Sequence, residues 1–148
     1  MKTYYHSPLG WIRVAYKGAE LFKLDFVPRR PSVSGLLDKG SLLFRQLDGY
    51  FHHKKKNFTF TKANQGTIFQ NRVWRALKTI PYGKTVSYGQ VASRIGKKKS
   101  VRAVARAIGQ NKIPIIIPCH RVIGSDGSLT GYAYGLRKKA WLLKHESD

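Results

Sequence analysis

The 148-residue sequence contains a single cysteine, Cys119, and only seven carboxylate side chains. One cysteine cannot form a disulfide within the chain, and the cysteine and histidine spacings of a zinc site are absent, so we expect a fold that depends on packing and binds no metal. No apolar run is long enough to span a bilayer, and the first residues lack the apolar core of a signal peptide. We therefore expect a cytoplasmic protein without membrane attachment, built as one domain or two small lobes.

The scarcity of acidic residues leaves a large excess of positive charge. The chain has 28 Lys and Arg residues and a formal net charge of +21. No carboxylate occurs from Gly49 to Ser125, a stretch of 77 residues that holds 16 basic ones. Such a surface binds phosphate backbones through counterion release, so a polyanion is the expected partner. A merely solvated lysine-rich surface is the simpler alternative, and an anionic membrane is disfavoured because no strongly amphipathic basic helix is evident.

The first half of the chain reads as a small sheet domain. Aromatic and β-branched segments separated by turn residues predict an antiparallel meander, with strands over 3–6, 11–16 and 21–26. Apolar residues at helical spacing predict a helix over 36–51, and residues 57–61 alternate enough for a last strand. A composition shift at 63–66 marks the boundary, which gives domains at 1–62 and 67–148.

The second half predicts a helix-turn-helix. One apolar helical face runs from Phe69 to Ile80, and a capping box of Ser87 and Gln90 opens a short helix that stops at Gly96. Ser100 is positioned to cap a second helix, which ends at Gly109 and carries Arg102 and Arg106 on its exposed side. A closing helix is expected over 136–145. Such patterns are often only packed helices, but the missing carboxylates favour nucleic acid binding.

The stretch Ile115 to Arg121, Ile-Ile-Ile-Pro-Cys-His-Arg, is the chemically suggestive part. Its β-branched run predicts a buried, extended segment that is interrupted at Pro118 and followed by Cys119. The imidazole of His120 and the guanidinium of Arg121 would favour the thiolate, which makes the cysteine a candidate nucleophile. A buried structural cysteine is the alternative.

The segment Ile117-Pro118-Cys119-His120-Arg121-Val122 resembles the O6-alkylguanine-DNA alkyltransferases. The likeness also includes Asn111 and Pro114 before it and Gly131-Tyr132 and Trp141-Leu142-Leu143 after it, and extends over residues 68–146. It implies an α/β protein, with a small ribonuclease-H-like sheet domain in front of a winged helix-turn-helix domain. It also implies a DNA repair protein that moves an alkyl group from O6-alkylguanine irreversibly to its own cysteine, once per molecule and without a cofactor.

The resemblance assigns catalytic roles to four residues. Cys119 would attack the alkyl carbon, and His120 would act as its base through a water. Of the three carboxylates beyond residue 66, Asp126 suits a turn and Asp148 the terminus, so Glu146 remains to orient the imidazole. Asn111 would tie the helix-turn-helix to the active-site segment.

The resemblance also implies how the lesion is held. Tyr88 would donate to the guanine ring, Tyr132 would stack on it, Pro114 would line the alkyl pocket, and backbone groups of Cys119, Val122 and Ala133 would read the base edge. The target nucleotide would have to be flipped out of the duplex. Arg102 would fill the gap, and the second helix would enter the minor groove of double-stranded DNA. We expect a monomer associated with the nucleoid, with DNA contacts from Ser87, Ser100, Arg102, Ala105 and Arg121.

Two positions depart from the family pattern. Tyr134 stands where the family commonly has glycine and would narrow the pocket for large alkyl groups. Ala105 replaces a usual glycine in the second helix and would shift the DNA slightly. Three other functions compete: a non-catalytic sensor of alkylated DNA, a thiol hydrolase that uses Cys119 and His120, and a plain helix-turn-helix regulator.

Overall fold

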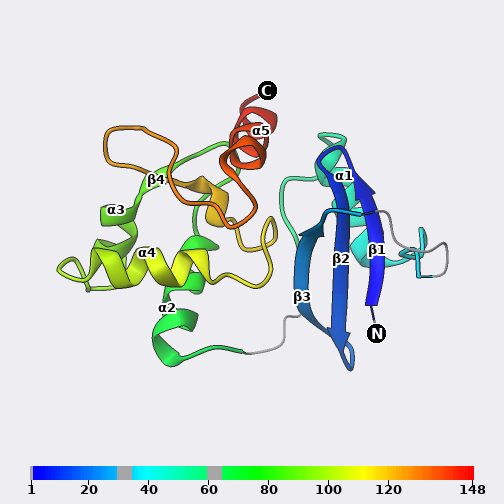
Figure 1. Ribbon diagram of the computed structural model, residues 1–148, viewed down its shortest axis with the longest axis horizontal. Coiled ribbons are helices and arrows are strands. Elements are labelled where there is room, and N and C mark those ends of the chain that lie inside the picture. The colour runs from blue at the N-terminus through cyan, green and yellow to red at the C-terminus, as the bar shows by residue number, and fades with distance from the viewer. Residues whose placement is uncertain (1, 30–34, 60–64) are drawn as a thin grey trace. The chain divides into compact units, whose positions relative to one another are not determined.

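The computed structural model describes residues 2–29, 35–59 and 65–148. The chain divides into two compact units, Met1–Ala63 and Asn64–Asp148, each considered by itself below (Figure 1). Among the described residues, no helix is both long enough and apolar enough to cross a membrane.

The first unit is built on the predicted antiparallel meander. Strands β1 (Lys2–Ser7), β2 (Gly10–Lys17) and β3 (Glu20–Val27) pair in that order. The turn between β2 and β3 contains Gly18 at φ +64°, a conformation that glycine adopts without steric cost. In β2 alternate side chains face the core, and Ile12, Val14, Leu21 and Leu24 are fully buried.

Helix α1 (Leu42–Phe51) begins later than predicted. Ser41 caps it by accepting a 3.1 Å hydrogen bond from the Phe44 amide. The predicted strand over 57–61 is absent at 57–59, and its last two residues lie outside the described part of the chain. Among the described residues, the backbone there bonds to a side chain and not to another strand. The amide of Thr59 donates a hydrogen bond to the side-chain oxygen of Gln46 at 3.1 Å.

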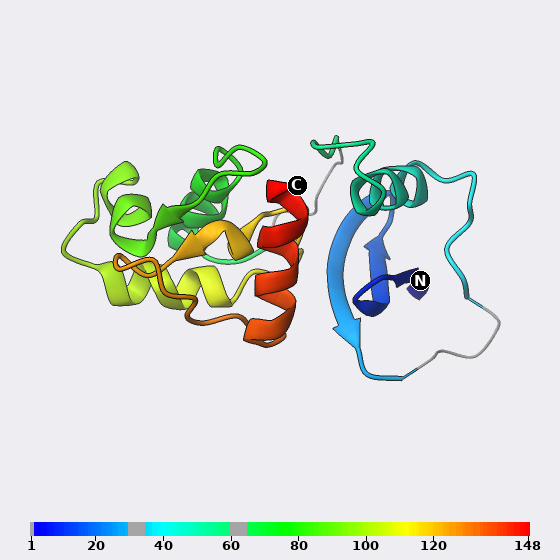
Figure 2. The ribbon, with the colours of Figure 1, turned by 90° about the horizontal axis from the view of Figure 1, so that it is seen from above.

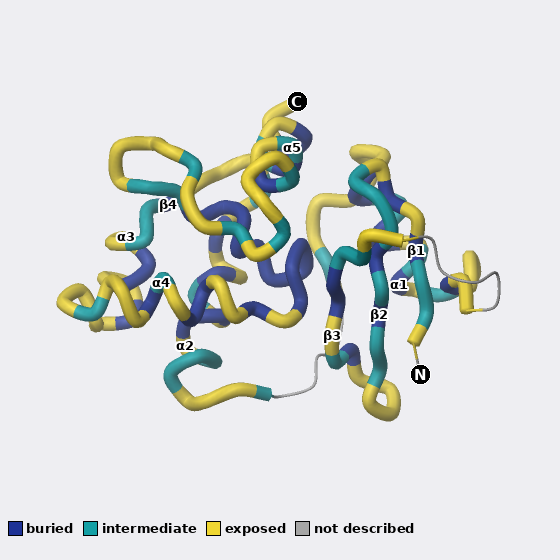
Figure 3. The backbone as a smooth tube through the Cα atoms, in the orientation of Figure 1, coloured by how far each residue is buried: buried dark blue, intermediate teal, exposed yellow. Residues whose placement is uncertain are grey.

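The second unit consists of helices that pack on one another and a short parallel ladder. Its elements are α2 (Ile68–Leu77), β4 (Val86–Ser87), α3 (Tyr88–Arg94), α4 (Val101–Gly109), the 3₁₀ turn η1 (Cys119–Arg121), β5 (Val122–Ile123) and α5 (Leu136–Ser147). Strand β4 pairs with β5. Figure 3 shows the buried parts of the backbone in dark blue. The buried residues of this unit include Val73, Leu77, Val104, Ile108 and Leu142.

The helix-turn-helix follows its local sequence signals with one exception. The capping box at α3 is present, since Ser87 accepts from the Gln90 amide at 3.1 Å and Gln90 accepts from the Ser87 amide at 2.7 Å. Gly96, at φ +71°, follows the end of α3. Ser100 does stand at the N-cap of α4, but its side chain makes no capping hydrogen bond.

The Ile115–Ile117 run is buried as predicted, but it is not extended. Ile115 and Ile116 form a turn, closed by a 2.9 Å hydrogen bond from the Ile117 amide to the Ile113 carbonyl. Ile115 has φ +74°, which is unfavourable for a β-branched residue. The residue is 1% exposed, so its burial holds the strained backbone in place.

Candidate active site

Cys119 is the first residue of η1 and follows the interrupted Ile115–Ile117 segment. Its residue exposure is only 8%, yet it lines a pocket. The pocket wall comes from the end of α4, from the segment before η1, and from the loop that precedes α5. Besides Cys119, the lining residues are Ile108, Gly109, Asn111, Gly131, Tyr132, Ala133 and Tyr134. The thiol therefore borders a cavity, as a nucleophile must.

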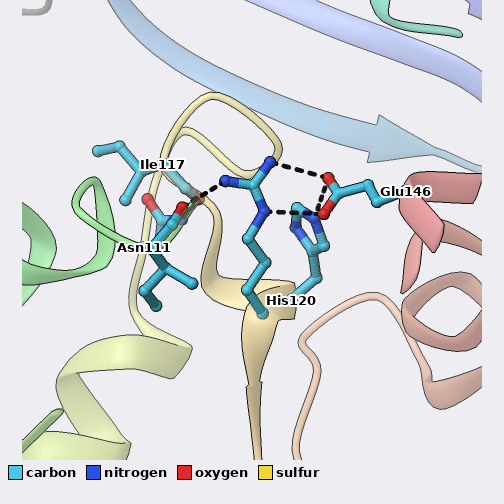
Figure 4. A network of polar contacts seen from close by, with 6 residues as sticks. Asn111, Ile117, His120 and Glu146 are labelled. Carbon is cyan, nitrogen blue, oxygen red and sulfur yellow. Dashed lines mark hydrogen bonds and ion pairs between the residues drawn. The ribbon is translucent and has the colours of Figure 1, made fainter. Parts of the chain in front are cut away.

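Asn111 joins the helix-turn-helix to the cysteine. It follows the C-terminal end of α4, its Nδ2 donates to the Ile117 carbonyl at 2.7 Å, and its Oδ1 accepts from the Ile113 amide at 3.0 Å (Figure 4). Both bonds are buried, so the amide fixes the turn that leads into Cys119. The role that the resemblance implied for Asn111 stays a prediction.

His120 and Glu146 meet inside the protein although they are 26 residues apart. His120 Nε2 lies 2.7 Å from Glu146 Oε2, and neither side chain is more than 1% exposed (Figure 4). Burial lowers the pKa of His120, which keeps the imidazole neutral. A neutral ring that donates from Nε2 has Nδ1 as its proton acceptor. Within the described residues, this Nδ1 is buried and has no hydrogen-bond partner.

Arg121 binds the same carboxylate, and its position differs from two of our predictions. Its Nε donates to Glu146 Oε1 at 2.8 Å, its Nη2 to Glu146 Oε2 at 3.0 Å, and its Nη1 to the Ile80 carbonyl at 2.7 Å. The residue is 7% exposed, so Arg121 is not a DNA contact. Burial opposes ionisation of Glu146, but the hydrogen bonds from His120 and Arg121 outweigh it and hold the pKa of Glu146 well below its usual value. Arg121 thus stabilises this anion rather than the thiolate.

The cation that acts on the thiol is Lys139, which the sequence analysis missed. Burial raises the pKa of Cys119. A hydrogen bond between the Asn111 side chain and the thiol, and the positive charge of Lys139, oppose that rise. Lys139 is fully buried in α5, and burial lowers the pKa of its amine. Its Nζ donates to the Thr130 carbonyl at 2.7 Å and lies 3.5 Å from the hydroxyl of Tyr88. The resting thiol is therefore protonated and needs a base.

The buried side of α5 explains why Lys139 was overlooked. We expected Leu136, Ala140 and Leu143 to face inward, but Leu136 and Ala140 are exposed. The buried stripe is Lys139, Leu142, His145 and Glu146. Lys139, Leu142 and Glu146 do follow the helical spacing i, i+3, i+7. Because most members of the stripe are polar or charged, the search for apolar periodicity selected the wrong side.

Only some of the residues expected to bind the base line the cavity. Tyr132 and Ala133 line it, and the Tyr132 ring meets Tyr134 edge-on at 5.8 Å between centroids. The Tyr88 hydroxyl donates to the Thr130 carbonyl at 2.7 Å, so it must exchange this partner before it can donate to a base. Pro114 and Val122 are both buried and are not among the lining residues.

The helix-turn-helix carries exposed basic side chains on α4, the helix whose end lines this cavity. Arg102 and Arg106 are exposed on α4, and Ile108 and Gly109 at the end of the same helix line the pocket. The other candidate DNA contacts, Ser87, Ser100 and Ala105, are partly exposed. No group of three or more His, Cys, Asp or Glu side chains suited to a metal ion occurs among the residues the structure describes.

Comparison with known proteins gives matches to both units. Residues 68–148 match the family described as 6-O-methylguanine DNA methyltransferase, DNA binding domain. Residues 1–62 match 6-O-methylguanine DNA methyltransferase, ribonuclease-like domain. These matches confirm the predicted fold class of a ribonuclease-like sheet domain followed by a DNA-binding helical domain.

Relatives match over nearly the whole chain. A protein of Methanosarcina barkeri named methylated-DNA--protein-cysteine methyltransferase is 46% identical, covering 96% of this chain and 94% of the relative. A protein of the same name from Mycobacterium leprae is 43% identical, over 95% of this chain and 88% of the relative. The crystal structure of Mycobacterium tuberculosis OGT in complex with DNA has a TM-score of 0.89 and 42% identity, covering 99% of this chain and 92% of that one.

Proposed function

The chain belongs to the 6-O-methylguanine DNA methyltransferase family, and we propose that it repairs alkylated DNA by moving the alkyl group from guanine O6 to Cys119. One observation carries the assignment of the acceptor. The cysteine lines a pocket, and a buried, carboxylate-bound histidine follows it in the chain. Residues 67–148 are the functional domain in this proposal, and residues 1–62 are the accompanying sheet domain.

The proposed reaction is a direct displacement at carbon. Cys119 Sγ attacks the alkyl carbon, the new S–C bond forms, and the electron pair of the broken C–O bond goes to guanine. The thiol proton passes to Nδ1 of His120 through a bridging water. The ion pair that Arg121 and Glu146 form then stabilises the imidazolium, and no cofactor takes part. Because the S–C bond is stable, each molecule reacts once.

Recognition of the base follows from the pocket. Tyr132 stacks on the guanine, Tyr88 exchanges its bond to Thr130 for one to the guanine ring, and the backbone of Ala133 reads the base edge. A pocket of this kind cannot reach a stacked base, so the nucleotide is flipped out. Pro114 and Val122, which are buried and do not line the pocket, support it from behind the lining residues.

DNA binding places α4 in the minor groove. Arg102 fills the gap that the flipped nucleotide leaves, while Ser87, Ser100 and Ala105 follow the backbone. The chain binds as a monomer and acts in the cytoplasm on nucleoid DNA. Since phosphate contacts dominate such binding, affinity falls steeply with added salt. Arg102→Ala slows repair in duplex DNA more than in single strands.

The test is the loss of O6-methylguanine from a short duplex supplied in excess. Wild-type protein removes one lesion per molecule and then stops. Cys119→Ser removes none but binds the duplex with similar affinity. Continued turnover would indicate a hydrolase, and binding without any loss in the wild type would indicate a sensor.

A further inference from the structure

Helix α2 carries a second basic surface that the repair reaction does not use. We define this α2 face as Arg72 and Arg75 of α2, Lys78 directly after its end, and Arg94 at the end of α3. All four residues are exposed. Within the described residues, none of them forms an ion pair with a carboxylate.

The α2 face points away from the proposed repair surface. Helix α2 buries Val73, Trp74 and Leu77, and Trp74 Nε1 donates to the Ala107 carbonyl of α4 at 2.8 Å. Arg72 and Arg75 lie on the opposite side of α2 from these buried residues. In Figure 2, α4 (yellow-green) and the loop after β5 (orange) lie on one side of the second unit, and α2 (green) lies on the other.

Helix α4 has the reverse orientation. It buries Val104, Ala107 and Ile108 toward the interior and exposes Arg102 and Arg106 on its outer side. The two helices are packed together through their buried sides, so their basic residues face in opposite directions. One straight duplex seated on α4 cannot also contact the α2 face.

The α2 face is held in position by contacts between α2 and α3. Arg72 Nη2 donates to the Ile95 carbonyl at 2.6 Å, and Arg94 Nη1 lies 3.4 Å from Thr79 Oγ1. Arg72 and Arg75 are three residues apart on one helix and repel each other, and α2 contains no acidic residue to offset this. A bound polyanion would remove that repulsion.

We propose that the α2 face binds the phosphate backbone of a second DNA duplex while the first duplex occupies α4. The contact reads charge and not sequence, because it consists of Arg and Lys side chains without a base-reading element. One molecule would then bridge two DNA segments, a property that does not depend on transfer to Cys119.

The test uses the intact chain with two short duplexes that carry different dyes, one with a lesion and one undamaged. Two-colour sedimentation at low salt is expected to show a complex of one protein with both duplexes. The double variant Arg75→Glu, Lys78→Glu is expected to lose that complex, weaken binding of the second duplex at least about tenfold, and lower the salt dependence of its binding by about two counterions. Its repair rate stays at the wild-type level.

Arg102→Glu, Arg106→Glu is the charge-matched control on α4. It should impair repair yet still bind one duplex through the α2 face. The proposal is overturned if the wild type forms no complex with both duplexes, if the α2 variant forms it equally well, or if every bridged complex contains two protein molecules.

Discussion

The carboxylate of Glu146 accepts a 2.7 Å hydrogen bond from Nε2 of His120 in a part of the protein that solvent does not reach. This bond makes Nδ1 the free proton acceptor, and the bidentate Arg121 keeps the carboxylate ionised. The arrangement gives the neutral thiol of Cys119 a base without placing a net charge beside it. The predictions below test its parts separately.

Glu146→Gln removes the charge while keeping the shape of the side chain. Arg121 is then a buried cation without its anion, so the free energy of unfolding should fall by about 3–5 kcal/mol. Methyl transfer should slow at least about tenfold, part of the roughly 100- to 10,000-fold that a positioned base supplies. Single-turnover rates and urea unfolding measure the two effects. Asp148→Asn, which removes an exposed carboxylate nearby, should change neither.

Lys139→Met removes the buried cation whose charge favours the thiolate. The pKa of Cys119 should rise further above its ordinary value, and transfer at neutral pH should slow. The pH dependence of thiol alkylation by a small reagent measures this directly, and its midpoint should move to higher pH. Lys144→Met, an exposed position on the same helix, serves as the control. An unchanged midpoint in Lys139→Met would show that this charge does not act on the sulfur.

The buried imidazole predicts how stability depends on pH. Burial lowers the pKa of His120 in the folded protein, so below pH 6.5 the unfolded chain takes up a proton that the folded chain does not. The free energy of unfolding should therefore fall as pH decreases from 6.5 to 5, by up to roughly 1.4 kcal/mol per unit. Glu146 stays ionised in the folded protein, and it adds to the slope only toward pH 5, where the carboxyl group of the unfolded chain begins to take up a proton. Denaturant titrations of His120→Gln should lack this part of the slope, and equal slopes would contradict the account.

Tyr134 is predicted to limit the size of the alkyl group. Its ring lines the pocket next to Tyr132, where a large substituent would have to fit. The wild type should react more slowly with O6-benzylguanine than with O6-methylguanine in DNA, and Tyr134→Ala should narrow that difference about tenfold. The methyl reaction of the same variant is the internal reference. Equal rates for both substrates in the wild type would show that the ring does not obstruct entry.

The sequence was informative where structure depends on neighbouring residues. The capping box of Ser87 and Gln90 is a local signal, and the helix begins where it predicts. The prediction of an extended segment at Ile115–Ile117 was wrong, because hydrogen bonds from Asn111 and to the backbone of Ile113 impose a turn that β-branched residues disfavour. These contacts come from residues just before the run, so they leave no pattern within the run itself.

Adjacency in sequence also misled the assignment of charges. Successive residues of a 3₁₀ turn point about 120° apart, and here Cys119 lines the pocket while His120 and Arg121 both reach Glu146. Arg121 turns toward Glu146, and the cation near the sulfur comes from Lys139, 20 positions later. A lysine on the buried side of a helix cannot be recognised by its hydrophobicity.

The most direct measurement is peptide mass analysis of the protein after incubation with a duplex that contains O6-methylguanine. The account predicts one added methyl group, located on the peptide that holds Cys119, in an amount equal to the lesion lost. An unchanged mass despite DNA binding, or a methyl group on any other residue, would contradict it.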